Sequence, residues 1–342
     1  MRISLSFILA LSVSTSSYGG LLNTDSAKND TVVVRYVNSQ TSFGSSVPAG
    51  NYSGIVWLGK SRYAVVSDKS VTDGFFIFDI DIDSISGKIK HVENNGFFSA
   101  SAANRDQEGI TYVRSRKKIY ISGESDNRVL EYNLDGTYTG RYMNIPSEFA
   151  SAGQSYGIES LTYNDSTNRF WLTTESTLPC DGQRSTYNLP VKNILRLQCF
   201  NDSLQPLGLY YYEMDKPIVR KTPGKYAFGV SDICALDDGQ LLVMEREFFV
   251  ARHKLGSWVN IKIFIVDPNE SLAGKFLPKS KVLEFRTSLS LLKYDLANYE
   301  GMCLGPRLVD GSRVLLLVSD SQNRYGGVLK DYFKTIILRI GQ

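Results

Sequence analysis

The chain repeats a unit of two short β-strands that carries an acidic residue where the first strand begins and another where the second strand ends. Glu108-Gly-Ile-Thr-Tyr is followed by Tyr-Ile-Ser-Gly-Glu124, and Glu159-Ser-Leu-Thr-Tyr by Trp-Leu-Thr-Thr-Glu175. In an antiparallel hairpin the start of one strand faces the end of the next, and directly opposed side chains lie about 5 Å apart. Each unit therefore places two acids side by side at one end of a hairpin.

Three further copies of this unit extend the pattern along the chain. They are Asp232-Ile-Cys-Ala-Leu with Leu-Leu-Val-Met-Glu245, Glu300-Gly-Met-Cys-Leu with Leu-Leu-Val-Ser-Asp320, and a weaker first copy, Ser53-Gly-Ile-Val-Trp with Ala-Val-Val-Ser-Asp68. If the units are arranged around an axis, their acids gather at one rim.

Other β-rich runs, bounded by Gly, Asn, Asp and Pro, sort with these hairpins into groups of four strands. We expect the groups 55–58, 63–67, 75–80 and 88–92; 110–113, 119–122, 129–133 and 140–143; 158–163, 170–174, 194–200 and 208–213; and 233–236, 241–244, 261–266 and 281–285. A fifth group has only 302–304, 314–319 and 335–340, and an early strand at 31–37 is left over.

Four-stranded groups that recur at intervals of roughly 50 to 70 residues indicate an all-β fold, a β-propeller. The spare N-terminal strand would complete the last group and close the ring, which also covers a free sheet edge. We count five blades, and a sixth would have to lie within 201–228 or 248–281. A β-sandwich is the alternative, but it does not predict acids at one fixed place in each unit. Only 288–296 looks briefly helical.

The N-terminus has the pattern of a secretion signal over residues 1–19, which leaves 20–342 as one propeller domain. Arg2 is followed by an apolar stretch and by small residues at Ser17-Tyr18-Gly19. We therefore expect a secreted or periplasmic protein with no membrane span in the mature chain. Among the four cysteines, Cys180 and Cys199 flank a long loop at 176–192 that they are able to bridge, whereas Cys234 and Cys303 are expected to be buried.

The repeated acids predict a cation site. Many carboxylates around one opening repel one another, and calcium, which takes six to eight oxygen ligands, relieves that repulsion. The first-strand acids point nearest the axis and are the expected metal ligands: Glu108, Glu159, Asp232 and Glu300. The second-strand acids are the candidate catalytic residues, as an outer shell or as proton carriers: Glu124, Glu175, Glu245 and Asp320. In the alternative interpretation, such acids only cap loops or pair with nearby basic residues.

Basic residues follow several of these acids and are the candidate substrate-binding residues: Lys69, Arg128, Arg246 and Arg324. Arginine beside a cation is suited to gripping an anionic substrate through two hydrogen bonds. These side chains would otherwise serve only to neutralise the neighbouring acids. The net charge of +3 gives no reason to expect nucleic acid as a partner.

Classical nucleophilic catalysis is not indicated. The two histidines, His91 and His253, lie outside the acid positions, so a Ser-His-acid triad is not expected. If the protein is an enzyme, we expect a bound cation to activate water and to polarise an ester or phosphoryl oxygen.

The motifs resemble those of the phytase-like family described as having esterase-like activity. The resemblance runs from about Gly54 to Asp320. It is carried by Gln-Glu108-Gly-Ile-Thr-Tyr, Tyr-Gly-Ile-Glu159-Ser-Leu-Thr-Tyr, Gly-Val-Ser-Asp232-Ile-Cys-Ala-Leu with Leu-Val-Met-Glu245-Arg246-Glu, and Asn-Tyr-Glu300-Gly-Met-Cys-Leu-Gly-Pro. It implies an exported propeller that hydrolyses esters or phosphoesters with calcium.

The leading functional hypothesis is thus an exported, calcium-binding hydrolase of phosphate or carboxylic esters, acting as a monomer on a small-molecule substrate. One alternative is a non-catalytic binding propeller in which the cation is structural and loop 176–192 recognises a ligand. Another is a calcium-dependent propeller lactonase, for which no well-placed histidine is found in the sequence.

Overall fold

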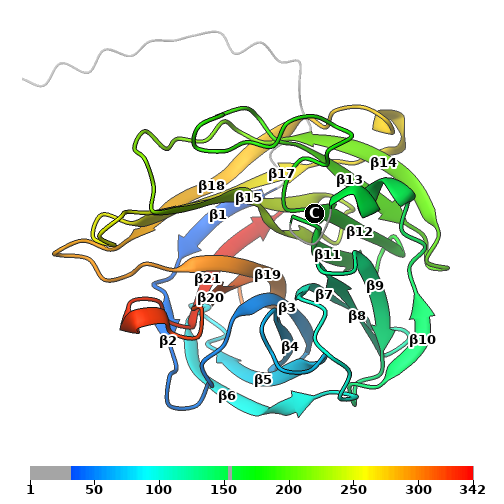
Figure 1. Cartoon of the computed structure of the whole chain (residues 1–342). Coiled ribbons are helices and arrows are strands. Elements are labelled where there is room, and N and C mark those ends of the chain that lie inside the picture. The colour runs from blue at the N-terminus through cyan, green and yellow to red at the C-terminus, as the bar shows by residue number, and fades with distance from the viewer. Residues whose placement is uncertain (1–31, 153–155, 342) are drawn as a thin grey trace, which may run out of the picture.

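The computed structural model describes residues 32–152 and 156–341, and they form five β-sheets arranged as the blades of a ring (Figure 1). The predicted signal at 1–19 lies outside the described residues. The first blade contains β3(Tyr52–Gly59), β4(Arg62–Ser67), β5(Phe75–Ile82) and β6(Ile89–Phe98), and the second contains β7(Gln107–Val113), β8(Lys118–Gly123), β9(Arg128–Tyr132) and β10(Tyr138–Tyr142). The third blade contains β11(Ile158–Asn164), β12(Arg169–Thr174), β13(Ile194–Phe200) and β14(Pro206–Glu213). The fourth contains β15(Lys225–Ala235), β16(Leu241–Val250), β17(Trp258–Val266) and β18(Lys279–Ser288).

The fifth blade closes the ring in the predicted way. It contains β19(Asn298–Arg307), β20(Arg313–Asp320) and β21(Tyr332–Ile340), and the N-terminal β1(Val32–Val37) pairs with β21 as its fourth main strand. The short β2(Thr41–Ser42) also pairs with β21. The all-β prediction of five blades is confirmed. The stretches 201–228 and 248–281, where a sixth blade was considered, instead supply strands and loops of blades three and four.

Burial falls from the axis outward, as expected for sheets packed face to face around a ring. The second strand of the first blade is buried on both faces from Tyr63 to Ser67 because neighbouring blades cover both. The outermost β10 of the second blade is largely exposed. The first strands of all five blades pack next to one another around the channel (Figure 1).

Each first strand has a β-bulge near its start, and all five bulges lie at the same end of the channel. The bulged residues are Ser53, Glu108 with Gly109, Glu159, Ser231 and Glu300. A bulge leaves a residue out of the ladder and re-aims its side chain, which here directs these residues toward the channel. In three blades the next residue is glycine because the neighbouring first strand is so close: a Cβ on Gly54 would lie 2.3 Å from the Glu108 carbonyl oxygen.

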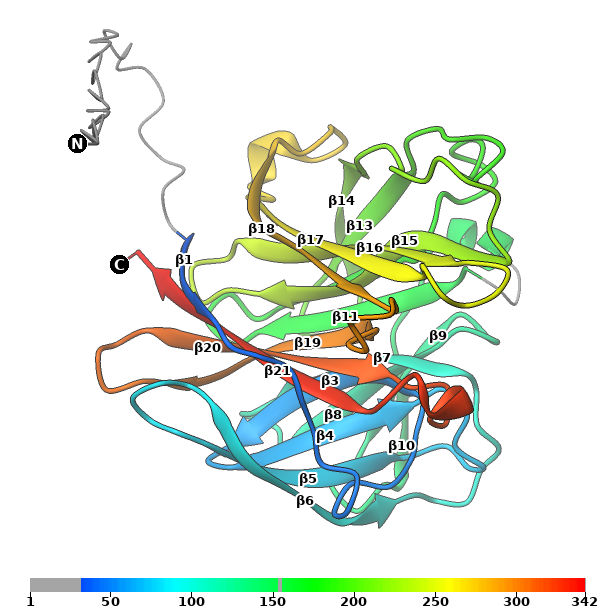
Figure 2. The same ribbon diagram turned by 90° about the vertical axis from the view of Figure 1, so that its left-hand side faces the viewer.

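We call the bulged end of the channel its mouth. The loop after β20, with the short 3-10 helix η3(Tyr325–Gly327), lies at this end, whereas the start of β1 and the end of β21 lie at the other (Figure 2). Two further short 3-10 helices, η1(Ser147–Ala152) and η2(Glu270–Leu272), lie in loops. No helix in the described part of the chain is long and apolar enough to cross a membrane.

Two local expectations are wrong. Residues 288–296 form a tight turn rather than a helix, with an isolated bridge between Leu289 and Tyr294 and a hydrogen bond from the Ser290 amide to the Lys293 carbonyl. Cys180 and Cys199 are free, because Cys180 lies in a loop at the mouth end and Cys199 near the opposite end of β13. The loop at 176–192 is instead held by Asn193, whose side-chain oxygen accepts hydrogen bonds from Thr177 and Ser185. Cys234 and Cys303 are buried, as expected.

Candidate metal centre and active site

Strand register defines which residues surround the mouth. In each blade the inner position is the bulged residue of the first strand. The outer position lies on the second strand: in the first blade Tyr52, which precedes the bulged Ser53, pairs with Ser67, so the outer residue is the next one, Asp68. We call these ten residues the mouth ring: Ser53, Glu108, Glu159, Ser231 and Glu300 inside, and Asp68, Glu124, Glu175, Arg246 and Asp320 outside. Seven of these ten residues are acids, and the fourth blade supplies none of the seven.

The fourth blade differs from the sequence-based assignment by one residue on each strand. Val230 pairs with Glu245 and Asp232 with Met244, so the bulged residue is Ser231. Tyr299 pairs with Ser319 in the fifth blade, which makes Arg246 the counterpart of Asp320. Asp232 and Glu245 are therefore not mouth-ring residues.

Both of these displaced acids have structural partners elsewhere. The Asp232 carboxylate accepts hydrogen bonds from the backbone amides of Ile233, at 2.8 Å, and Met302, at 2.6 Å, which ties the fourth blade to the fifth. The Glu245 carboxylate accepts from the Tyr212 hydroxyl at 2.7 Å and from the Lys279 ammonium at 2.6 Å. Burial raises the pKa of both carboxyls.

Arg246 brings a positive charge into the mouth ring. Its Nη2 donates to Glu175 Oε1 at 2.6 Å, and its Nη1 contacts Glu300 and donates to Asn298 Oδ1 at 3.1 Å. Its side chain is 5% exposed, and the contacts link blades three, four and five. The guanidinium thus neutralises two ring acids, and both of its terminal nitrogens are already engaged.

Glu108 and Glu159 are buried without such a partner. Within the described residues, neither carboxylate accepts a hydrogen bond or joins an ion pair, although the two residues are only 8% and 7% exposed. Burial raises the pKa of Glu108 well above its usual range, and the charge of Glu159 raises it further. Burial likewise raises the pKa of Glu159, with a further contribution from Glu175, while the charge of Arg246 lowers it in part. Unpaired buried carboxylates are costly, and a bound cation would compensate them.

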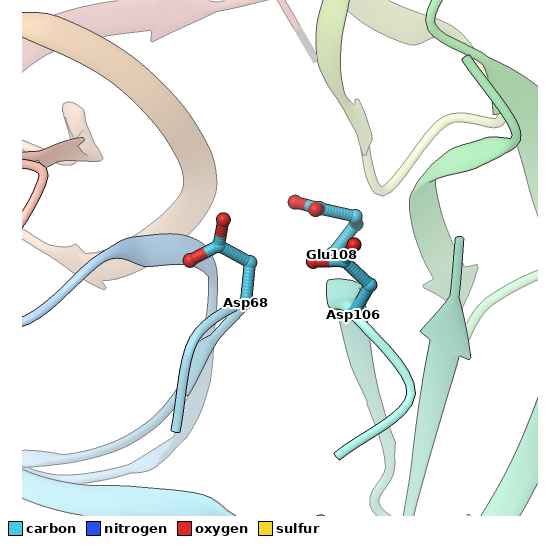
Figure 3. Close-up of side chains that lie close together, drawn as sticks. All are labelled: Asp68, Asp106 and Glu108. Atoms are coloured by element: carbon cyan, nitrogen blue, oxygen red, sulfur yellow. The ribbon is translucent and has the colours of Figure 1, made fainter. Parts of the chain in front are cut away.

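Three carboxylates at the edge of the ring converge closely enough to share one ion. One oxygen each from Asp68, Asp106 and Glu108 lies within 4.8 Å of the others (Figure 3). The Asp68 Oδ1 atom is buried and has no hydrogen-bond partner in the described part of the chain. An all-oxygen donor set of this kind suits a hard cation such as calcium.

Asp106 is a site residue that the repeat pattern did not predict. It precedes the second-blade strand by one residue and adopts a left-handed conformation, with φ of 59°. The Asn104 side-chain oxygen holds this turn by accepting hydrogen bonds from the backbone amides of Asp106 and Gln107. The available signal was a second acid two residues before Glu108, in Asn104-Arg-Asp-Gln-Glu.

Lys69 is already positioned as a counter-ion to this cluster. Its ammonium lies 3.2 Å from Asp68 Oδ2 and 2.5 Å from Asp106 Oδ1, and its side chain is 59% exposed. Lys69 therefore lies beside the mouth ring, where sequence reasoning expected a substrate-binding residue, but it also competes with any metal at the cluster.

Two outer acids are held by hydrogen bonds. Glu124 accepts from the backbone amides of Tyr156 and Gly157. Asp320 accepts from the Gln322 amide at 2.6 Å and from Asn298 Nδ2 at 3.3 Å. Burial raises the pKa of Asp320 to about 6, with a smaller contribution from the charge of Asp68.

The remaining two basic candidates lie away from the ring. The Arg128 guanidinium stacks over Tyr142 on the outermost strand of its blade, 4.8 Å from the ring centroid. Arg324 donates to Asp331 Oδ2 and to the Val47 carbonyl, each at 2.6 Å. Both arginines have structural contacts, and neither contacts a mouth-ring side chain among the described residues.

The fold and the site define a five-bladed β-propeller with an acid-rich channel mouth. The chain belongs to the phytase-like family described as "Esterase-like activity of phytase", whose sequence model matches residues 47–322. No curated protein matches the chain.

Among solved structures, the chain is similar to an endo-arabinase from Bacteroides thetaiotaomicron, with 12% identity, a TM-score of 0.46 and coverage of 89% of this chain and 98% of that one. It is also similar to virginiamycin B lyase from Staphylococcus aureus, with 9% identity, a TM-score of 0.38 and coverage of 88% and 98%. These similarities are too remote to bear on function.

Proposed function

We propose that this protein is an exported, metal-dependent hydrolase of phosphate or carboxylic esters whose site is the mouth ring. The observation that carries the proposal is the convergence of Asp68, Asp106 and Glu108 beside a second unpaired acid, Glu159. Membership of the phytase-like family supports the reaction class. The apolar stretch at the N-terminus supports export.

Calcium is the proposed ion, with Asp68, Asp106 and Glu108 as its first ligands. When bound, it would polarise the ester or phosphoryl oxygen and stabilise the negative charge that develops there. We assign Lys69, which is exposed beside the cluster, to hold an anionic group of the substrate. Asp320, whose pKa burial raises to about 6, is the ring acid that we assign to take up and release a proton. Arg246 keeps Glu175 and Glu300 in place.

The test begins with metal analysis of protein purified without chelator. Hydrolysis of p-nitrophenyl phosphate and p-nitrophenyl acetate is then measured with calcium and with chelator. The variant Glu108→Gln removes one ligand charge at nearly constant volume, and Glu284→Gln makes the same change on the outer strand β18. We expect activity that needs calcium and that is lost only in Glu108→Gln. Negligible turnover of both substrates in every condition would overturn the catalytic proposal.

A non-catalytic binding propeller is the second candidate. It is favoured by the Arg246 contacts, which link three blades through buried charges and so make ring neutralisation a structural requirement in itself. In that case chelation lowers the melting temperature of the protein, but no substrate is turned over with or without calcium.

A further inference from the structure

An apolar pocket of about 430 Å³ lies between the fourth and fifth blades at the mouth end. Its wall is formed by Phe248, Val250, Leu289, Leu296, Val328 and Leu329. The volume falls in the range of small-molecule sites, which are mostly apolar with a few polar groups at one side. No acidic side chain lines this pocket in the described part of the chain.

The pocket is continuous with the mouth ring along one strand. Side chains alternate across a β-strand, so Arg246, Phe248 and Val250 share one face of β16. With about 3.3 Å between successive residues, Phe248 begins the pocket wall roughly 7 Å beyond Arg246. On the fifth-blade side, Gln322 lines the pocket, and its backbone N–H donates a hydrogen bond to Asp320 of the mouth ring. A molecule with one end at the ring therefore extends naturally into this pocket.

The outer edge of the pocket is positively charged. Lys225, Arg252 and Lys254 line it and are exposed, and the Lys254 ammonium lies 4.4 Å from the centroid of the Tyr325 ring. Beside them, the turn after β18 exposes Leu291 and Leu292, at 78% and 97%. A basic edge next to exposed aliphatic side chains favours the approach of an amphiphile with a negative group over that of a sugar-like or cationic molecule.

We infer that this pocket binds the hydrocarbon chain of the substrate, so that the enzyme acts on esters of alkyl or acyl chains rather than on compact, highly charged phosphates. The inference rests on the proposed function only in placing the ester group at the mouth ring. The chain-binding pocket itself rests on its lining, its continuity with β16 and its basic edge.

The experiment uses n-alkylphosphonates, which mimic alkyl phosphate esters but are not hydrolysed, with chains from methyl to decyl. Binding to the full-length mature protein is measured by calorimetry, once with calcium and once with chelator. We expect the Kd to fall about fourfold per added methylene, the ratio that burial of one CH₂ gives, until the pocket is filled. This dependence on chain length should persist in chelator, because it arises in the pocket and not at the metal.

Two variants locate the binding site. Val328→Trp fills the pocket from a surface turn and should abolish the chain-length dependence, and Val250→Trp fills it from β16 as a second test. Val309→Trp, on an exposed loop at the opposite end of the channel, is the control and should bind as the unaltered protein does. Melting temperatures establish that each variant is folded.

Absence of chain-length dependence in the unaltered protein, or its persistence in both folded pocket variants, would overturn the inference. Loss of p-nitrophenyl ester hydrolysis alone would not, because that result concerns the mouth ring. The experiment can therefore contradict the proposed pocket without contradicting the proposed function, and the reverse.

Discussion

The two halves of the mouth ring solve one electrostatic problem in different ways. On the side of blades three to five, Arg246 lies between Glu175 and Glu300 and neutralises both from within the chain. On the side of blades one and two, Asp68, Asp106 and Glu108 converge with only the exposed Lys69 beside them. Blades one and two supply three ring acids and blades three to five supply four, but only the second set surrounds an arginine; we call it the closed half and the first set the open half. An external cation is therefore expected at the open half, beside Glu159, and not between Glu175 and Glu300.

Removal of the internal cation should have the largest effect. Arg246→Met leaves Glu175 and Glu300 buried without a counter-charge, although Asn298 Nδ2 still donates to Glu300 at 2.8 Å, and we expect a loss of about 3–5 kcal/mol in the free energy of unfolding. Urea denaturation in chelator measures this loss. The control, Arg307→Met, removes an exposed pair with Asp237 and should cost less than about 1 kcal/mol. Equal, small losses in both variants would show that the closed half is not held by its arginine.

The same kind of change in the open half should have the opposite sign. Glu108→Gln removes a buried carboxylate that has no hydrogen-bond or ion-pair partner among the described residues, so the metal-free protein should become more stable at neutral pH. Calcium affinity should fall at least tenfold, about the minimum seen when even residues that support metal ligands are lost. Calorimetric calcium titration and melting in chelator test the two effects, with Glu284→Gln as the control. A Glu108→Gln protein that binds calcium normally would place the ion elsewhere.

The buried ring acids that form no ion pair within the described residues should also make stability depend on pH. A carboxyl whose pKa is raised in the folded state stabilises the fold at pH values below its unfolded pKa, and that contribution is lost as the pH rises through the folded pKa. For Asp320, which faces Asp68, Arg246 and Asn298, this window runs from about 4 up to about 6. Glu108 and Glu159 act in the same direction at higher pH, since their pKa values are raised further.

Other carboxyls, such as Asp215 beside Lys262 and Lys279, have a lowered pKa and act in the opposite direction, so the measurement compares two proteins. The melting temperature in chelator is recorded from pH 5 to 8 for the unaltered chain and for Glu108→Gln with Glu159→Gln. The unaltered chain should lose more stability over this range, and calcium should abolish most of the difference. Parallel curves without calcium would contradict the raised pKa values.

The sequence was sufficient to predict the fold because the signals for it are local. Strand-forming runs, turn residues and the spare N-terminal strand predict blades and ring closure without knowledge of any long-range contact. The site depends on bulge register, which is a property of strand pairs. Asp232 lies one residue after the ring position Ser231, and Glu245 lies one residue before the ring position Arg246. Because the prediction aligned the blades by their acids, it was wrong by one residue on each strand. Matching the apolar residue instead, Ile233 with Ile110, would have placed Ser231 in the ring.

Asp106 was missed for a different reason, because it lies in the loop before the repeat and not within it. Its place in the cluster depends on the left-handed turn held by Asn104, and one loop in one blade provides no repeat with which to compare it. Cys180 and Cys199 show the same limit: their nearness along the chain concealed that they lie at opposite ends of a blade.

The smallest predicted effect concerns Lys69, the basic residue beside the open half, and distinguishes two roles for its ammonium group. If Lys69 competes with calcium for Asp68 and Asp106, Lys69→Met should tighten calcium binding by up to about fivefold, since an exposed ion pair is worth at most about 1 kcal/mol. If Lys69 instead holds the substrate, the same variant should raise KM for p-nitrophenyl phosphate. Both effects together would mean that Lys69 and calcium bind the acid cluster alternately. Calcium binding would then displace the Lys69 ammonium toward the substrate. Lys60→Met, on the tight turn between β3 and β4, provides the matched control, and unchanged calcium affinity in both variants would place the ion away from Asp68 and Asp106.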